Sequence, residues 1–550
     1  MKHIYILLIS IFSFCVLAAP SHIKNVQGYT FDEVGELIEF TDLIFDSGKV
    51  LAIGSRNLAN QYPDAQVIDG KQHILLPGII DAHGHILGLG ETLLAVDVRD
   101  IASAKASAEK VRDYAQQNPD LDWVLGGGWN QVLWPGQQFP TAAMLDEYIQ
   151  DRPVWISRVD GHAGWANSKA LQIAGITKDS LDPPGGQIMR DNNGVPTGIL
   201  IDNAMTMLWE KVPQDTEKSL KRKLDAASEY LLSLGVTSVH DAGIGYDTYQ
   251  YYIKRSQEMG LRMRIYAMIA ATDPKLAEML AKGPVYDQYD YLAIRSVKVY
   301  GDGALGSRGA AMLAPYADDK DNKGLLLTPL KQLKPLFDLI IGKGFQLNIH
   351  EIGDRGNRLA LDQFEDTFSR IEGQHLRNRI EHAQVIEVSD IPRFKSLEII
   401  PSMQPTHATS DMNMAQERIG KIRLEGAYAW QTFEKQGSMV TFGSDFPVEL
   451  ANPFFGLHAA VTRQNRENQP DEGWIKGEAV SVEQAFKAFT LNAAYAAHQE
   501  KILGSLTPGK WADFILLDQD IFAIPPQEIW KTKVLETWVG GVKAFDSKNH

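Results

Sequence analysis

The strongest constraint on this chain is the stretch Leu-Pro-Gly-Ile-Ile-Asp-Ala-His-Gly-His at residues 76–85. The apolar run behind Pro77 and Gly78 predicts a short buried strand that ends in two histidines one residue apart. Because side chains alternate along a strand, His83 and His85 lie on the same face. We expect both imidazoles to reach one point beyond the strand, which indicates a metal site if other parts of the chain supply further ligands.

Length and composition define the class of protein. The chain has 550 residues, more than one hydrophobic core usually holds, so we expect a large catalytic domain with a smaller one. Its 44% apolar and 22% charged residues are typical of a globular protein. The net charge is −15 and no Lys/Arg run is present, which argues against nucleic acid and anionic membranes as partners. We expect a small-molecule substrate, and the sequence makes no prediction of oligomeric state.

The first 19 residues have the pattern of a secretory signal peptide. Lys2 and His3 precede an apolar run that ends in Ala18 and Ala19, and this run is shorter than the roughly 20 residues a membrane-spanning helix needs. Cys15 is the only cysteine, so cleavage leaves none and excludes disulfides, thiolate metal ligands and a cysteine nucleophile. We expect an exported, most simply periplasmic, protein that has no membrane contact after cleavage.

Short β-like segments occur at both ends of the mature chain. They are residues 42–45, 49–54, 512–518 and 534–541. Two separate groups of short strands around a long central segment predict one small β-domain built from both ends, with bounds 20–75 and 500–550. The central segment, 76–499, would then be a single inserted catalytic unit.

Within the central segment, β-like runs alternate with amphipathic helical ones such as 216–234 and 330–343. The strand candidates are 152–158, 235–240, 294–300, 345–350, 379–382, 398–403 and 439–445. Repeated β–α alternation of this length predicts an α/β fold and favours a parallel barrel over an open sheet.

Polar residues gather at the ends of these candidate strands. His350, His382 and Asp445 each end an apolar run, and Lys298 lies within one. In a parallel barrel the carboxyl ends of all strands meet on one face. Together with the first two histidines, six groups that can serve a metal site are therefore expected to converge there.

These residues resemble the metal-dependent amidohydrolase superfamily, specifically its amidohydrolase 3 branch of YtcJ-like and N-substituted formamide deformylase-like proteins. The matching motifs are residues 77–85, 297–308, 349–354, 379–384, 443–448 and 504–513. The resemblance covers nearly all of the mature chain. It implies a (β/α)₈ TIM-like barrel, a β-sandwich made from both termini, and an insertion after the first barrel strand at about residues 97–231.

The histidines suit zinc. Neutral imidazoles of His83, His85, His350 and His382 are good Zn²⁺ ligands where no thiolate is available. Taken singly, each histidine also fits a hydrogen-bonded buried residue, the interpretation we keep for the other ten of the 14. Asp445 leaves an apolar strand, and its burial would be costly unless it is coordinated or paired. We predict that it is a metal ligand and the general base and acid; the alternative is a helix cap.

Lys298 is predicted from the resemblance to be carboxylated. An ammonium cannot bind a cation, but a carbamate formed with CO₂ could bridge two of them. The alternative is a salt bridge, for instance with Asp302, which would leave a site for one metal. We therefore expect one or two Zn²⁺, or another divalent transition metal, per chain.

Further residues are candidates for substrate contacts. Asp160-Gly161-His162 resembles segments that lie near the substrate pocket in this branch, and His162 could stabilise an oxyanion, with a structural role as the alternative. Trp129 could line an apolar pocket or belong to an ordinary core. Arg308 could bind an anionic substrate group or form an ion pair at the surface.

The sequence thus predicts an exported metal-dependent hydrolase of carbon–nitrogen bonds other than peptide bonds. Its substrate would be an amide, an N-acyl or N-formyl compound or a cyclic amide, attacked by a metal-activated water. Ester, lactone or phosphotriester hydrolysis on the same site is the enzymatic alternative, and a zinc deaminase is less favoured because of Lys298. A binding protein that kept the barrel and lost its chemistry is the alternative from another class.

Overall fold

The structure is a computed structural model that describes residues 19–99, 101–158, 163–183 and 186–549. Residues 1–18 of the predicted signal peptide lie outside this set. The chain forms two compact units, one made of the segments up to His85 and from Ser228, the other of Ile86–Ala227. In the described residues, no helix combines the length and apolar character needed to cross a membrane.

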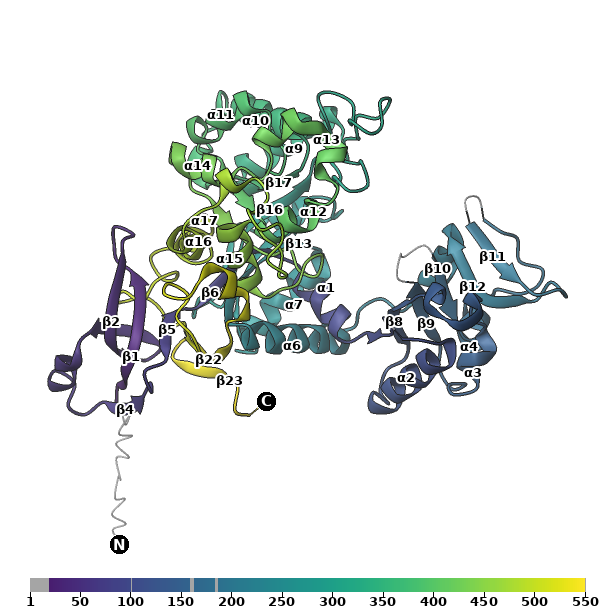
Figure 1. Cartoon of the computed structure of the whole chain (residues 1–550), viewed down its shortest axis with the longest axis horizontal. Coiled ribbons are helices and arrows are strands. Elements are labelled where there is room, and N and C mark those ends of the chain that lie inside the picture. Colours follow the sequence, from purple (N-terminus) through teal and green to yellow (C-terminus); the bar gives the residue numbers. More distant parts are fainter. Residues whose placement is uncertain (1–18, 100, 159–162, 184–185, 550) are drawn as a thin grey trace, which may run out of the picture. The chain divides into compact units, whose positions relative to one another are not determined.

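Both ends of the chain contribute to one eight-stranded sheet in the first unit, where purple N-terminal and yellow C-terminal strands meet (Figure 1). Its path is β23-β22-β21-β5-β1-β2-β3, and β4 also pairs with β1. The Phe45 ring packs against the rings of Phe514 and Trp538, 5.8 and 6.0 Å between centroids, so strands from the two ends share a core as in a β-sandwich. The strands are β1 (Ser21–Phe31), β2 (Leu37–Asp46), β3 (Lys49–Gly54), β4 (Gln66–Asp69), β5 (Ile74–Pro77), β21 (Phe514–Leu517), β22 (Val534–Val539) and β23 (Val542–Asp546).

Eight parallel strands form the barrel in the order β6-β13-β14-β16-β17-β18-β19-β20. The first and last strands are joined where Asp445 N donates to His83 O at 2.7 Å and His85 N donates to Phe446 O at 2.8 Å. This confirms the predicted barrel. Its strands are β6 (Ile79–Gly84), β13 (Val236–Ile244), β14 (Arg264–Ala270), β16 (Leu292–Tyr300), β17 (Gln346–Glu351), β18 (Arg379–His382), β19 (Ile400–Met403) and β20 (Thr441–Phe442), and β15 (Val285–Tyr286) pairs with β16 at the edge.

Helices alternate with these strands and cover them, as α9 and α10 do for β17 (Figure 1). The predicted helix at 330–343 is α9, with its apolar side formed by Leu333, Phe337 and Ile340. The helices are α7 (Tyr246–Gln257), α8 (Leu276–Ala281), α9 (Leu330–Gly342), α10 (Asp354–Phe368), α11 (Ile391–Ser396), α12 (Pro405–Asp411), α13 (Ala415–Arg423), α14 (Trp430–Gln436), α15 (Pro453–Thr462), α16 (Val482–Ala488) and α17 (Leu491–Ala496).

Two strand assignments differ from those predicted. β14 was not predicted, because its apolar run begins with a charged residue, Arg264. In the structure this guanidinium is buried against Asp513, with Nε 2.6 Å from Oδ2. The predicted strand at 152–158 does form, as β9 (Val154–Arg158), but it belongs to the sheet of the second unit and not to the barrel.

The second unit, Ile86–Ala227, occupies the region where the insertion was expected at about 97–231. Its sheet has the order β11-β12-β10-β9-β8-β7. It begins before residue 97 because α1 packs against α6: Gly90 is so close to the backbone of Lys223 that a Cβ would lie 2.1 Å from its carbonyl oxygen. The elements are α1 (Ile86–Leu93), β7 (Val96–Asp97), α2 (Ala104–Gln117), β8 (Val124–Trp129), α3 (Ala142–Asp146), β9, β10 (Ala163–Ala166), α4 (Ser168–Ala174), β11 (Gly186–Arg190), β12 (Pro196–Asp202), α5 (Thr206–Trp209) and α6 (Glu217–Ser233).

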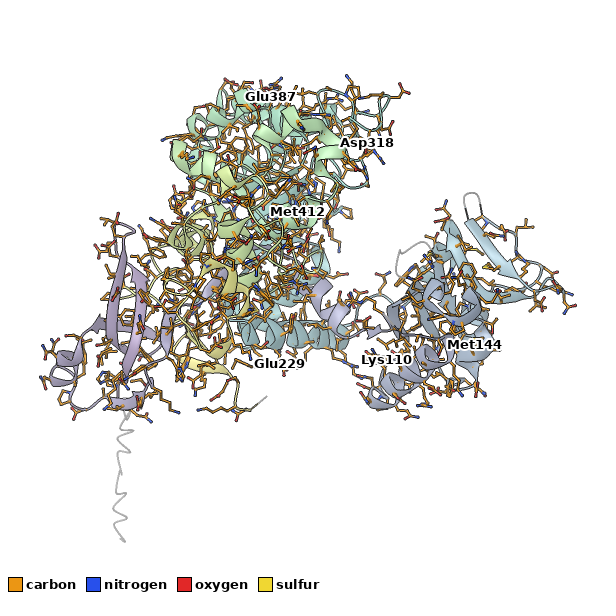
Figure 2. The ribbon with its side chains drawn as sticks, viewed as in Figure 1. Lys110, Met144, Glu229, Asp318, Glu387 and Met412 are labelled. Carbon is orange, nitrogen blue, oxygen red and sulfur yellow. The ribbon has the colours of Figure 1, made fainter. Side chains whose placement is uncertain are left out.

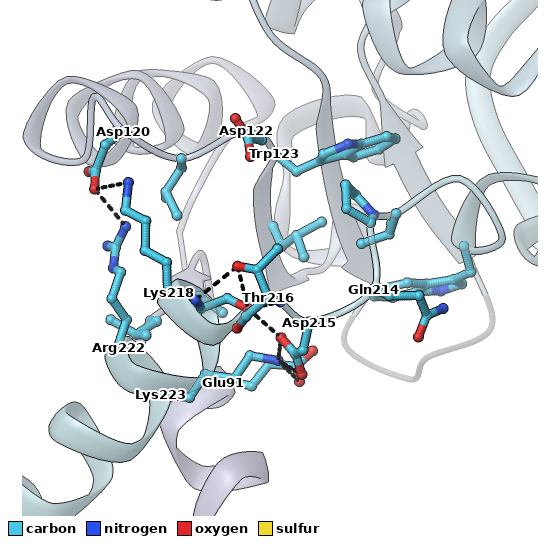
Figure 3. A pocket seen from close by; sticks show the side chains of 18 residues that line it. Glu91, Asp120, Asp122, Trp123, Gln214, Asp215, Thr216, Lys218, Arg222 and Lys223 are labelled. Atoms are coloured by element: carbon cyan, nitrogen blue, oxygen red, sulfur yellow. Dashed lines mark hydrogen bonds and ion pairs between the residues drawn. The ribbon is translucent and has the colours of Figure 1, made fainter. Parts of the chain in front are cut away.

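A cavity of about 430 Å³ opens within this second unit (Figure 3). Its basic residues come from α6 and are paired inside the cavity. Asp120 lies 3.2 Å from Lys218 Nζ and 3.4 Å from Arg222 Nη1, and Lys223 binds Glu91 and Asp215. The three basic side chains of the cavity are therefore neutralised by carboxylates, and the predicted metal residues lie elsewhere.

We predict that Gly90→Ala destabilises the protein. The added methyl group would collide with the α6 backbone, and overpacking of this kind costs about 1–3 kcal/mol. The matched control is Gly342→Ala at the end of α9, where a Cβ meets nothing within 4 Å and the helix gains up to about 1 kcal/mol. Thermal and denaturant unfolding measure both; equal stability of the two variants would contradict the packing described here.

Candidate metal centre

The carboxyl ends of the barrel strands bring the predicted histidines together. The ring centroids of His83 and His382 are 4.9 Å apart, those of His350 and His382 are 4.4 Å apart, and those of His83 and His85 are 5.6 Å apart. The four rings come from the ends of β6, β17 and β18. The structure therefore brings the four predicted imidazoles together at the carboxyl end of the barrel.

Asp445, which follows β20, lies at the centre of this cluster. Its Oδ1 is 3.2 Å from Nε2 of His85 and 3.7 Å from Nε2 of His83. Two ligand atoms about 2.0–2.1 Å from a tetrahedral Zn²⁺ are separated by about 3.4 Å. The ligand atoms of His83, His85 and Asp445 lie within 4.8 Å of one another, so this trio has the spacing of a metal site.

Several buried polar atoms at the cluster have no hydrogen-bond partner among the described residues. They include Asp445 Oδ1, His350 Nε2 and His407 Nε2. Buried polar atoms are nearly always partnered, and unpartnered ones are costly. A divalent cation would satisfy such oxygen and nitrogen atoms, so the donor set fits a metal.

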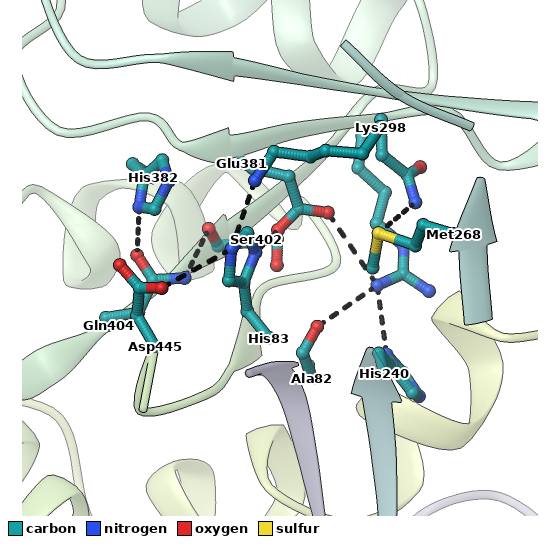
Figure 4. A network of polar contacts seen from close by, with 12 residues as sticks. Ala82, His83, His240, Met268, Lys298, Glu381, His382, Ser402, Gln404 and Asp445 are labelled. Carbon is teal, nitrogen blue, oxygen red and sulfur yellow. Dashed lines mark hydrogen bonds and ion pairs between the residues drawn. The ribbon is translucent and has the colours of Figure 1, made fainter. Parts of the chain in front are cut away.

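Neighbouring side chains fix the orientation of two of the imidazoles (Figure 4). Nδ1 of His83 lies 2.6 Å from Oε2 of Glu381, and Nδ1 of His382 lies 2.7 Å from Oε1 of Gln404. In each case Nδ1–H donates to the oxygen and leaves the Nε2 lone pair for a cation. Such outer partners orient metal-bound histidines and raise their basicity.

Glu381 is itself held in a buried network (Figure 4). Burial raises its pKa, and the charge of Arg379, with Nη1 3.9 Å from Glu381 Oε1, opposes that rise. Arg379 is fully buried, with Nη1 3.0 Å from Nδ1 of His240 and Nη2 donating to the Ala496 carbonyl at 2.6 Å. The carboxylate that orients His83 is therefore anchored to the barrel core.

Lys298 lies inside the cluster, with Nζ 3.1 Å from Nε2 of His83. Burial lowers its pKa, although Glu381 and Asp445 oppose this shift. The alternative partner, Asp302, is occupied elsewhere: its carboxylate accepts backbone N–H groups of Ala311, Ile352 and Gly353 at 2.7–2.8 Å. The structure therefore places Lys298 with the histidines and not in a salt bridge with Asp302.

The backbone is strained at two of these residues. His382 has φ of 74° and Asp445 has φ of 62°, both in the left-handed region that few non-glycine residues adopt. Strained residues of this kind cluster at functional sites, where the surrounding structure holds them. In His382 and Asp445, this backbone conformation changes the direction of the side chain at the point where the strand ends.

The lower-ranked candidates lie away from the cluster or outside the described residues. Trp129 corrects the pocket prediction: it is fully buried in the core of the second unit, and its Nε1 donates to the Ile156 carbonyl at 2.7 Å. Arg308 forms an ion pair with Asp318, with 2.9 Å between Nη2 and Oδ2. Both residues lie on the loop after β16, and Figure 2 labels Asp318. Asp160 and His162 lie outside the described residues.

His407 was not predicted as a site residue, yet its Nε2 lies 3.5 Å from Asp445 Oδ2. The orienting partners Glu381 and Gln404 were not predicted either. One signal was available: Gln404-Pro405-Thr406-His407 directly follows the predicted strand 398–403, which had no polar residue assigned to its end. Because His407 is on helix α12 and not on the strand, strand alternation could not place it.

The family model "Amidohydrolase family" matches residues 66–545. The chain belongs to the amidohydrolase family. The amidohydrolase is 30% identical to the putative amidohydrolase YtcJ of Bacillus subtilis, over 94% of this chain and 98% of that one. It is 25% identical to the N-substituted formamide deformylase of Arthrobacter pascens, over 92% and 94%.

A solved structure is also similar to this amidohydrolase. An uncharacterized metal-dependent hydrolase from Pyrococcus furiosus matches with a TM-score of 0.77 and 28% identity, over 92% of this chain and 100% of that one. This chain thus belongs to a family of metal-dependent hydrolases and carries side chains at the barrel end that could hold a metal ion.

We predict that Glu381→Gln weakens metal binding about 10–100-fold, because the amide holds the His83 tautomer less firmly than the carboxylate does. Gln404→Met, which removes the acceptor for His382, is expected to act in the same direction. Competition with a chromophoric chelator measures the affinity, and Glu372→Gln at an exposed position is the control. Wild-type affinity in both folded variants would show that these contacts do not orient metal ligands.

Proposed function

We propose that this chain is an exported, metal-dependent amidohydrolase that hydrolyses the C–N bond of a small non-peptide amide, with N-formyl and N-acyl amines as the first candidates. The observation that carries the proposal is the trio of His83, His85 and Asp445, with its unpartnered oxygen at the barrel end. Family membership and the similarity to a formamide deformylase support the C–N bond as target.

The donor set favours zinc. The histidines present neutral nitrogen, because burial lowers the pKa of His83 and His382 well below the ordinary value and that of His350 to about 3. Imidazole and carboxylate ligands suit Zn²⁺ when no thiolate is available, and Cys15 is the only cysteine. When bound, such a cation polarises a substrate carbonyl and lowers the pKa of water.

Asp445 is the proposed proton carrier. Burial raises its pKa, but the close imidazoles of His85, His83 and His407 outweigh burial and lower the pKa below the ordinary value. Its carboxylate is therefore ionised and able to accept the proton of the attacking water. The protonated carboxyl group can then pass this proton to the leaving nitrogen as the C–N bond breaks.

We further propose that Lys298 is carboxylated. Its burial favours the uncharged amine, which is the form that adds to CO₂ and loses a proton to give a carbamate. The neighbouring imidazole of His83 places this nitrogen beside the metal ligands. A carbamate there would add anionic oxygen to the set of ligands.

Export is proposed from the N-terminal sequence alone. The pattern of a basic start, an apolar run and a small-residue end supports cleavage near Ala19 and a periplasmic location.

We predict C–N hydrolysis in a screen of N-formyl amines, N-acyl amino acids and cyclic amides, with lactones and phosphotriesters as competing classes. A chelator should abolish turnover and Zn²⁺ should restore it. Asp445→Asn should lower kcat by about 10²–10⁴ because the proton carrier is lost, whereas Asp64→Asn on the exposed surface should not. Cleavage of lactones or phosphotriesters without any amide cleavage would contradict the proposed reaction.

A carbamate on Lys298 is testable without substrate. Protein equilibrated with ¹³C-bicarbonate and divalent metal is expected to show a carbamate carbonyl signal by NMR. Lys298→Ala should remove the signal, and Lys24→Ala, in the terminal sheet, should leave it unchanged. Identical spectra for wild type and Lys298→Ala would exclude the modification.

A further inference from the structure

A cavity of about 160 Å³ lies in the first unit, where helices α12 (Pro405–Asp411) and α15 (Pro453–Thr462) pack against each other (Figure 1). Its walls come from these two helices, from the turn after Asp445 and from the segment that follows α15. An engineered cavity of about 150 Å³ holds a benzene molecule, so this one has room for a small organic compound. The polar lining residues include Thr406, Thr409, Ser410, Glu449, Gln464 and Arg466.

Two buried polar atoms of this cavity have no hydrogen-bond partner among the described residues. They are Oγ1 of Thr406 and Oε1 of Gln464, in residues that are 8% and 4% exposed. Gln464 Nε2 donates to the carbonyl oxygens of Pro470 at 3.1 Å and Asp471 at 2.9 Å, so the orientation of the amide is fixed and Oε1 can only accept. Because buried polar atoms are nearly always partnered, these two indicate a ligand with N–H or O–H donors.

The other two hydroxyl groups of α12 have already given their protons to protein acceptors. Thr409 Oγ1 donates to the Thr406 carbonyl at 3.0 Å, and Ser410 Oγ donates to Oε1 of Glu449. The lone pairs of both hydroxyl oxygens and the carboxylate of Glu449 therefore remain as acceptors. Burial lowers the pKa of His458, so this ring adds no positive charge to the wall.

The charged side chains of the wall favour a cation. Glu449 and Glu467 are both present, and Arg466 is the only Lys or Arg among the described residues that line the cavity. Its guanidinium lies over the ring of Phe455, with Cζ 4.8 Å from the centroid. Two carboxylates thus face one guanidinium, and the free atoms of the wall are acceptors. A primary ammonium group, which has three N–H donors and no acceptor, matches this lining.

Helix α12 connects the cavity with the candidate metal centre. Its three hydroxyl residues lie three and four positions apart on one face, and all three line the cavity. A second face carries His407, whose Nε2 is 3.5 Å from Asp445 Oδ2. Glu449 N also donates to the carbonyl oxygen of Asp445 at 3.4 Å. A ligand in the cavity would therefore contact both segments that carry these two residues of the metal centre.

We propose that this cavity is a binding site for a small primary ammonium compound, held by Thr406, Gln464 and Glu449 beside the metal centre. The site does not depend on the proposed C–N hydrolysis, because none of these three side chains is a proposed metal ligand. It extends that function in one respect. Hydrolysis of the N-formyl or N-acyl derivative of a primary amine releases that amine, so the product of the proposed reaction belongs to the same class as the ligand.

The experiment is a ligand-observed NMR titration of the metal-loaded protein with butylammonium, and with 1-butanol and butyrate as neutral and anionic probes of the same length. Butylammonium should bind, in the millimolar range expected for so small a ligand, and the other two probes should not. Thr406→Val removes the hydroxyl group and keeps the shape, and should weaken binding about 5-fold. Glu449→Gln removes the charge, and should weaken binding about 10-fold or more.

Two control variants match these changes. Ser238→Ala removes another buried, unpartnered hydroxyl group, in β13, and Glu372→Gln removes an exposed charge; both should bind butylammonium as wild type does. Thermal unfolding without ligand checks folding. Thr406→Val should unfold at the wild-type temperature or above it, because the hydroxyl that it loses has no partner. If Thr406→Val does not fold, Glu449→Gln alone decides.

Three results would overturn the inference. The first is no binding of butylammonium to wild type, which would mean that the cavity holds only water. The second is equal binding of the three probes. The third is wild-type affinity in both Thr406→Val and Glu449→Gln, which would place the amine elsewhere, for instance at the metal centre. An active amidohydrolase that does not bind butylammonium would refute this site and leave the proposed function standing.

Discussion

The carboxylate of Asp81 helps to close the barrel beside the candidate metal centre. It accepts hydrogen bonds from His83 N at 3.1 Å, Ser444 N at 3.0 Å and Ser444 Oγ at 2.6 Å, and so ties β6 to the end of β20. Burial raises the pKa of Asp81 to about 7 against the effect of these bonds. Gly443 permits the approach, because a Cβ there would lie 2.5 Å from His83 N. This junction adds to the backbone hydrogen bonds of Asp445 and His85 that also join the first and last barrel strands.

Three further features position the side chains of the candidate site around that junction. Strand ends provide the imidazoles and Asp445, and left-handed backbone at His382 and Asp445 turns two of the side chains. Glu381 and Gln404 then select the nitrogen that each ring presents. Since these supports lie on strands or directly behind them, the barrel and not the loops holds the site in place.

Sequence reasoning located the part of the site that depends on strand periodicity. His83, His85 and His382 could be placed because alternation and parallel strand order decide where a strand end points. His407 lies on a helix after its strand, and its direction depends on how Asp411 anchors that helix, which no local pattern encodes. For Trp129 the sequence left a pocket and a core open, because an aromatic residue in a β-run has the same pattern in either place, and the structure places it in a core.

The same limit explains the strand errors. Local pattern predicts that residues 152–158 are extended but not which sheet they join, because partners are chosen by packing across the whole unit. β14 was missed because its first residue is Arg264, a charge whose partner Asp513 lies in the C-terminal segment. Both cases depend on contacts far apart in the chain.

The pairing of β5 with β21 has a consequence for how the chain acquires its structure. Pro77 pairs with Phe514, so the edge of β5 stays open until residue 514 has been made. Closing so long a loop is entropically unfavourable, and topologies rich in distant contacts fold slowly. The sheet that β5 and β21 share is therefore expected to close late in folding, because it needs segments more than 400 residues apart in the chain.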